Sequence, residues 1–285
     1  MKLAINRFKT RVSLPAFNKK FFSSPWVKYL ALGIVFYCLF LIASIPATWL
    51  SWGLSKYSNG VLAITQPEGS LWSGQGHVIA SYMRSSPHDF GLTEWSINPL
   101  WWLTGRLQLD LRGLDKDLQA DIRIRRSFSG TTLRNSRLLV PASFIAKLYA
   151  PAGLFSPEGR IEVHASTLSL SEDGLGGRLV INWSDAGSAL SPVKPLGDYS
   201  LVLEGKGKTG ELKLTTRNGD LELTGQGKWN VTGNGLLSFN GTANPRTRKS
   251  ELEPLLKLLG RDLGNGRRLL RFNTRISLIK SKNKK

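Results

Sequence analysis

The sequence predicts a mainly β protein, with a single N-terminal transmembrane helix followed by a large antiparallel, curved β-sheet domain that carries one or two short helices. Two observations lead to this prediction. Residues 29–50 contain no charge, and most of the chain beyond Trp52 alternates apolar and polar residues. Alternation with a period of two is typical of strands with one buried and one exposed face, which favours antiparallel pairing.

The apolar run YLALGIVFYCLFLIASIPATWL is long enough to cross a bilayer as a helix. A helix rises about 1.5 Å per residue, and the hydrocarbon core of a bilayer is about 30 Å thick. Tyr29 stands at one end of the run, and Trp49 and Leu50 stand at the other. The length of the run favours an uncleaved anchor over a signal peptide, so we expect a transmembrane anchor at residues 29–52.

Flanking charge predicts the orientation of this anchor. Residues 1–28 carry seven Lys and Arg residues and no acid, whereas Lys56 is the only basic residue among the twenty that follow the apolar run. The positive-inside rule then makes residues 1–28 a basic cytoplasmic tail and places the domain at residues 53–276 across the membrane. A second basic tail follows at residues 277–285.

The net charge of +19 is concentrated at the two ends of the chain, and the body between them is close to neutral. A nucleic-acid-binding domain more often spreads basic residues over a folded face, so we expect no nucleic-acid partner. The single cysteine, Cys38, excludes a disulfide within the chain and a metal site built from several cysteines.

Alternating segments recur along the domain, among them LTGRLQLDLRG, ADIRIRR, GRIEVHASTLSLS, GRLVINW, YSLVLEG, GELKLTT, GDLELTGQGKWNV and GLLSFNGTA. The connections between them are short and rich in Gly, Asn and Asp, and Asn218-Gly219 between two such segments is a strong hairpin signal. Residues 199–243 therefore predict a β-meander of about four strands.

Helices are scarce in the domain. PASFIAKLYAP, residues 141–151, allows at most two turns between its prolines. SELEPLLKLLG predicts a helix that Ser250 caps and Gly260 ends, with Leu252, Leu255, Leu256 and Leu259 on one stripe. We expect this helix to cover part of the apolar face of the sheet.

The stretch GSLWSGQG, residues 69–76, sets a large ring among small residues between the strand-like segments VLAIT and HVIASYM. Its glycines allow tight or positive-φ backbone, so the segment predicts the turn of the first hairpin. We expect Trp72 to be largely buried there.

Candidate catalytic residues are few. The three histidines share no metal-ligand spacing, and no G-x-S-x-G motif occurs. GKGKTG, residues 205–210, satisfies G-x-G-x-x-G, but a strand-like segment follows it where a phosphate site needs a helix. We interpret it as a hairpin, and we expect no enzymatic activity, no cofactor and no metal.

The order of several motifs resembles the protein N family of the bacterial type II secretion system, from about residue 30 to about residue 276. The family signature falls on Gly69, Leu71, Trp72, Gly74, Trp95, Pro99, Leu255 and Gly260. The resemblance implies a Gram-negative inner-membrane protein with a periplasmic β-rich domain. It also implies an accessory role in assembling the machinery that exports folded proteins across the outer membrane, and it offers no catalytic residues.

Two functional interpretations remain open. In the first, the domain docks on other secretion-system components through exposed strand edges or through Trp101 and Trp102. In the second, it resembles AsmA-like envelope proteins, and an apolar β-groove binds or transfers membrane lipid. The fate of the apolar face separates them: a helix at 251–260 and a turn at 141–150 that cover it favour docking, and an open groove favours lipid.

Overall fold

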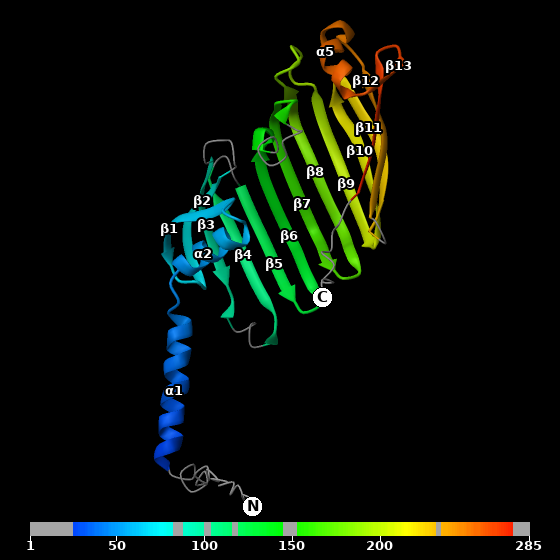
Figure 1. The fold of residues 1–285 in the computed structure, drawn as a ribbon. Coiled ribbons are helices and arrows are strands. Elements are labelled where there is room, and N and C mark those ends of the chain that lie inside the picture. Colours follow the sequence, from blue (N-terminus) through cyan, green and yellow to red (C-terminus); the bar gives the residue numbers. More distant parts are fainter. Residues whose placement is uncertain are drawn as a thin grey trace, which may run out of the picture. The chain divides into compact units, whose positions relative to one another are not determined.

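The computed structural model describes residues 25–81, 88–99, 104–115, 119–144, 153–231 and 235–275. The chain divides into two units at Ser44 and Ile45. The first contains helix α1, Pro25–Ala43, and the second contains helices α2, Thr48–Tyr57, and α5, Lys249–Leu259, with a sheet of fourteen strands. The predicted mainly β fold with one apolar N-terminal helix is confirmed (Figure 1).

The strands form one antiparallel sheet, and they follow one another across it in chain order up to β12. After β12 the chain forms α5, and β14 then pairs with β12 while the short β13 pairs with the outer side of β14. The strand bounds are β1 Leu62–Gly69, β2 Ser73–Ala80, β3 His88–Ile97, β4 Leu107–Leu114, β5 Gln119–Ser127, β6 Gly130–Pro141, β7 Pro157–Ser171, β8 Gly174–Ser188, β9 Gly197–Gly207, β10 Thr209–Gly219, β11 Leu221–Asn230, β12 Leu236–Pro245, β13 Arg261–Gly264 and β14 Arg267–Arg275.

The predicted meander over residues 199–243 is confirmed as β9 to β12, each strand paired with the next. The GKGKTG stretch is the β9–β10 hairpin, because Lys206 pairs with Thr209 across it. Gly207 takes φ +73° at this turn, a conformation that L side chains rarely adopt. No helix follows the loop, so it lacks the strand–helix setting of a phosphate-binding motif.

One face of the sheet is apolar across most of its strands. Directly paired residues share a face, so the register can be followed from strand to strand. One such row reads Ile97, Leu109, Ile124, Leu133, Leu168, Gly177, Gly205, Gly210, Trp229 and Leu237. The neighbouring positions on β9 to β11, such as Glu204, Lys213 and Lys228, lie on the opposite face and are exposed.

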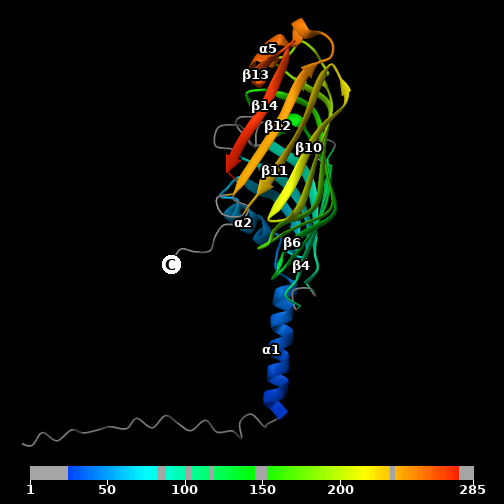
Figure 2. The same cartoon turned by 90° about the vertical axis from the view of Figure 1, so that its right-hand side faces the viewer.

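Two helices pack on the apolar face, one near each end of the sheet. Leu50 and Leu54 of α2 pack against Ile64 and Trp95. Leu252, Leu255 and Leu256 of α5 form a buried cluster with apolar residues of β11, β12 and the β8–β9 loop, namely Leu221, Ala243, Val193 and Leu196. The sheet is curved, and its two ends bend towards the same side (Figures 1 and 2).

The middle of the apolar face is only half-buried. Leu138, Val163, Ile181 and Leu201 follow one another in register across β6 to β9, and each keeps part of its surface exposed. Of the predicted helix at 141–151, the structure describes Ala142–Phe144, where Phe144 packs against the buried Val140 and Ile161. Residues 145–152 lie outside the described part of the chain.

The apolar run at residues 29–52 forms two helices, which corrects the expectation of one continuous helix. Helix α1 ends at Ala43, Pro46 forms an isolated bridge with Ser70, and α2 begins at Thr48. Proline cannot donate a backbone hydrogen bond to a helix interior, and here the chain bonds to the sheet instead. The window Trp26–Ala43, with a mean hydropathy of 2.0 over 18 residues and no burial, has the length and composition to cross a membrane.

Helix α5 confirms the predicted leucine stripe but begins earlier than expected. Leu252, Leu255 and Leu256 are buried, and Leu259 packs against their cluster. The N-cap is Arg248, with a left-handed φ of +47°, so Ser250 lies inside the helix and the prediction that it caps the helix is wrong. The start of the helix is set by tertiary contacts of the segment that precedes it, described below.

Candidate functional site

The GSLWSGQG stretch is the turn of the β1–β2 hairpin, as the sequence predicts. Gly69 pairs with Gly74, and the Ser70 hydroxyl accepts hydrogen bonds from the amides of Trp72 and Ser73, both at 3.2 Å. Trp72 is half-buried rather than largely buried. The deeply buried ring near this turn is another tryptophan of the signature, Trp95.

Trp95 explains why this turn is rich in small residues. It is 3% exposed, it pairs directly with Gly74, and its indole Nε1 donates a hydrogen bond to the Ser70 carbonyl at 3.2 Å. A Cβ at Gly74 would lie 2.6 Å from Cζ2 of the ring. The glycine therefore leaves the space that the indole occupies, and Gly69, Gly74 and Trp95 form one structural unit.

The other signature residues lie in different parts of the fold. Leu255 is 3% exposed in the α5 cluster. Gly260 follows α5 with φ +152°, close to the Leu269 carbonyl of β14. Pro99 is exposed just after β3, and Leu71 is half-buried in the β1–β2 turn. The structure thus places the signature in two packing clusters and two turns, and it does not gather these residues into one pocket.

The predicted anchor residues also lie on different elements, one on α1 and two on α2. Tyr29 lies on α1 and is 74% exposed. Trp49 lies on α2, is 61% exposed, and makes an edge-to-face contact with Trp52 at 6.3 Å between ring centroids. Leu50 packs towards the sheet. The candidate contact residues Trp101 and Trp102 lie outside the described residues.

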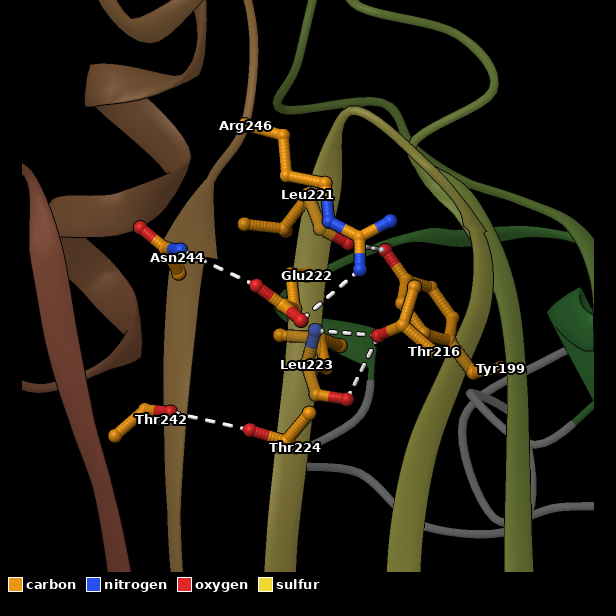
Figure 3. Close-up of polar contacts among 9 residues, drawn as sticks. All are labelled: Tyr199, Thr216, Leu221, Glu222, Leu223, Thr224, Thr242, Asn244 and Arg246. Atoms are coloured by element: carbon orange, nitrogen blue, oxygen red, sulfur yellow. Dashed lines mark hydrogen bonds and ion pairs between the residues drawn. The ribbon is translucent and has the colours of Figure 1, made fainter.

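A polar network at one end of the sheet was not predicted from the sequence. Glu222 of β11 accepts hydrogen bonds from Asn244 at 3.2 Å and from Arg246 at 2.9 Å (Figure 3). Thr216 of β10 bonds both the amide and the carbonyl of Leu223, each at 2.7 Å. These bonds fasten β10, β11 and β12 to one another where the segment leading to α5 begins.

Hydrogen bonds lower the pKa of two carboxyl groups in this region. The hydrogen bond from Arg246, followed by that from Asn244, lowers the pKa of Glu222. The hydrogen bond from Thr247, with a further bond and charge from Arg248, lowers the pKa of Asp220. Burial, with the nearby charge of Asp198, raises the pKa of the Tyr199 hydroxyl, which donates to the Leu221 carbonyl at 2.8 Å. Tyr199 and Glu222 thus join strands of the sheet, whereas Asp220 holds the segment that leads into α5.

The described residues contain no group of three or more His, Cys, Asp and Glu side chains that could hold a metal ion. His77 and Asp89 face each other at 3.2 Å, but both side chains are exposed. A hollow of about 810 Å³ lies over β1 to β5, and it is open and lined by charges of both signs, among them Glu94, Asp121, Arg112 and Arg123. The hollow therefore lacks the enclosed, mostly apolar lining of a typical small-molecule pocket.

The fold therefore defines a class: an antiparallel β-sheet protein preceded by a helix with the length and composition to span a membrane. The sequence matches the family described as type II secretion system (T2SS), protein N, over residues 61–271. It is also 30% identical over 234 residues to the type II secretion system protein N of Klebsiella pneumoniae, covering 77% of this chain and 84% of that protein. No solved structure matches the chain.

The chain belongs to the type II secretion system protein N family. The resemblance carried by the signature residues is thereby confirmed. The protein is an accessory component of type II secretion, and its family is not one of known enzymes.

Proposed function

We propose that the protein is anchored in the bacterial inner membrane by α1, with its N-terminus in the cytoplasm, and that its β domain supports assembly of the secretion machinery from the periplasm. The apolar window Trp26–Ala43 supports the anchor. The basic residues that precede it, and their scarcity after it, support the orientation. The contacts with other secretion components are then made by the β domain.

The observation that carries the docking proposal is the outer edge of β14. Strand β12 pairs with one side of β14 from Arg268 to Arg275, whereas β13 pairs only with Arg267, Arg268 and Leu269 on the other side. Among the described strands, none pairs with the outer edge beyond Leu269. An edge of this kind can accept an extended strand of a partner through main-chain hydrogen bonds.

Side chains at this edge are suited to a specific contact. Phe272 is 48% exposed and stacks on the buried Phe239, with ring centroids 5.1 Å apart. Its ring is therefore held in place before a partner arrives, which lowers the entropic cost of binding. Arg271 and Arg275 lie on the same strand and are exposed, so we expect the partner strand to carry acidic residues.

Photocrosslinking in intact cells tests the docking proposal. A photoreactive residue at Asn273 should crosslink to another secretion-system component, whereas the same residue at Lys213, exposed on the central strand β10, should not. Equal labelling from both positions, or no secretion component from Asn273 in cells that secrete normally, would contradict docking at β14. Phe272→Asp should weaken the Asn273 crosslink and leave the abundance of the protein unchanged.

The half-buried middle of the apolar face supports a second candidate function, lipid binding. Leu138, Val163, Ile181 and Leu201 leave apolar surface exposed between the regions that α2 and α5 cover. Native mass spectrometry of the detergent-extracted protein would detect a copurified phospholipid. A spectrum in which the protein carries no lipid across a range of detergents would exclude this function.

A further inference from the structure

The two edges of the sheet differ in how they are protected. At the β1 edge, the Ser51 hydroxyl of α2 donates a hydrogen bond to the Ile64 carbonyl at 2.6 Å, and the Leu62 amide donates to the Ser58 hydroxyl at 2.9 Å. Pro67 lies in a bulge of the same strand. Side chains that occupy the backbone groups of an edge strand, together with a proline and a bulge, keep it from pairing with another chain. The β1 edge is therefore protected.

The β14 edge has a defined stretch that can accept a strand. Strand β14 contains no proline and pairs with β12 without a bulge. On its other side, Arg268 holds β13 in place through ion pairs with Asp262 of β13 and Glu253 of α5, both at 3.1 Å. Because β13 pairs no further than Leu269, an incoming strand can pair from Leu270 to Arg275. This stretch suits a strand of about six residues, which is a common length.

The side chains of this stretch alternate between the two faces of the sheet. Phe272 pairs directly with Phe239 and shares the apolar face with it. Arg271 and Arg275 lie on the opposite face, where the residues paired with them on β12 are an asparagine and a leucine. No acid of β12 therefore stands directly opposite either arginine. The stretch presents an apolar ring on one face and two positive charges on the other.

Charge disfavours a second copy of this chain as the partner. Arg261 and Arg267 are also exposed at this edge, and four lysines follow in the tail at residues 277–285. Pairing the β14 strands of two copies would bring basic residues of both chains together, and like charges opposite each other destabilise a sheet. The β1 strand of another copy is protected in the way described above. A different protein with acidic residues is the better match.

We propose that β14 accepts a strand of another protein in which apolar and acidic side chains alternate. The apolar side chains pack beside Phe272 on one face, and the acidic side chains lie beside Arg271 and Arg275 on the other. This inference rests on the docking at β14 proposed above, and it adds the pattern by which a partner is recognised. Main-chain hydrogen bonds give such a complex its affinity, and the alternate side chains give it specificity. The opposite charges also speed the encounter of the two proteins.

Peptide binding to the full chain in detergent tests this pattern. The probe is a fluorescein-labelled peptide in which Val and Glu alternate. One control peptide has the same composition with its glutamates grouped together, and the other has lysine in place of each glutamate. Fluorescence anisotropy should show that the probe binds about ten-fold more tightly than either control, because charge pairs and apolar contacts across strands each contribute. No preference for the alternating peptide would overturn the proposal.

Charge reversal identifies the groups that recognise the peptide. Arg271→Glu combined with Arg275→Glu should move the preference to the lysine peptide. The matched control is Lys206→Glu combined with Lys213→Glu, which makes the same change in net charge at exposed positions of β9 and β10 and should leave the preference unchanged. An unchanged preference in the arginine variant, or the same shift in both variants, would overturn the proposal.

Crosslinking in cells separates a failure of this pattern from a failure of docking itself. The partner segment that crosslinks to a photoreactive residue at Asn273 is sequenced by mass spectrometry. We expect alternating apolar and acidic residues in that segment, and a weaker crosslink in the variant with Arg271→Glu and Arg275→Glu. A secretion component whose crosslinked segment lacks the pattern would overturn the proposal and leave docking at β14 standing. The absence of any secretion component would contradict both.

Discussion

Trp95 and Gly74 face each other across β2 and β3, and the indole of Trp95 fills the space that a side chain at Gly74 would need. The same relationship recurs in the second half of the sheet, where the indole of the buried Trp229 lies across its directly paired Gly210. In both places a glycine weakens its own strand and an aromatic ring of the neighbouring strand covers the gap. Two such pairs stabilise a sheet that has few helices packed against it.

Gly74→Ala is therefore expected to destabilise the protein by about 1–3 kcal/mol, as overpacking of a buried site usually does. The new methyl group would lie 2.6 Å from the Trp95 ring, so ring and backbone must both shift. Urea unfolding of the full chain in detergent, followed by tryptophan fluorescence, measures the change. Gly53→Ala on α2 is the control, since nothing lies within 4 Å of the added atom and alanine is the better helix former.

The two tryptophans should respond differently to replacement by phenylalanine. Trp95 donates from Nε1 to the Ser70 carbonyl, whereas the buried Nε1 of Trp229 has no hydrogen-bond partner among the described residues. Trp95→Phe should therefore cost about 1 kcal/mol more than Trp229→Phe, because only the first leaves an acceptor without its donor. Equal costs in parallel urea titrations would show that the Trp95 hydrogen bond contributes nothing net.

Much of the sheet could be predicted because its strands have one buried and one exposed face. Period-two alternation is a direct consequence of that arrangement, and it located the meander from β9 to β12 in the sequence. The register could not be predicted, because the pairing across β5 to β8 includes bulges near Arg123 and Ala165 that a pattern of apolar residues does not encode.

The same limits apply to the candidate site. The residues of the first hairpin could be singled out, but the ring that fills it comes from β3, and a local pattern gives no sign of which tryptophan turns inward. The break of the apolar run after Ala43 depends on hydrogen bonds that Ile45 and Ala47 make with the β1–β2 turn, which are tertiary contacts.

Helix α5 should contribute strongly to stability through its buried stripe. Leu256 is fully buried, and Leu258, two residues away, is 58% exposed. Leu256→Ala should cost about 2–5 kcal/mol, the range for a leucine removed from a packed core, and Leu258→Ala should change stability by less than about 0.5 kcal/mol. Thermal unfolding of the two variants beside the parent protein makes the comparison. Similar losses in both would mean that α5 does not pack as described.

Acid should weaken the end of the sheet where α5 begins. Asp220 binds Thr247 and Arg248, and Glu222 binds Arg246. The pKa values of both carboxyls are lower in the folded protein than in the unfolded chain. Their stabilising contribution is therefore complete well above pH 4, the usual range of free carboxyls, and it is lost as the pH falls through the folded-state values.

Glu222→Gln tests this dependence because it removes the titrating group and keeps the shape of the side chain. The variant should be less stable than the parent protein at pH 7, and the difference should shrink as the pH falls below about 4, where the parent carboxyl takes up its proton. Urea midpoints measured between pH 7 and pH 3 follow the effect. Glu172→Gln, in the exposed β7–β8 turn, should stay within about 0.5 kcal/mol of the parent throughout. A Glu222→Gln deficit that stays constant down to pH 3 would mean that its hydrogen bonds, and not its charge, stabilise this end of the sheet.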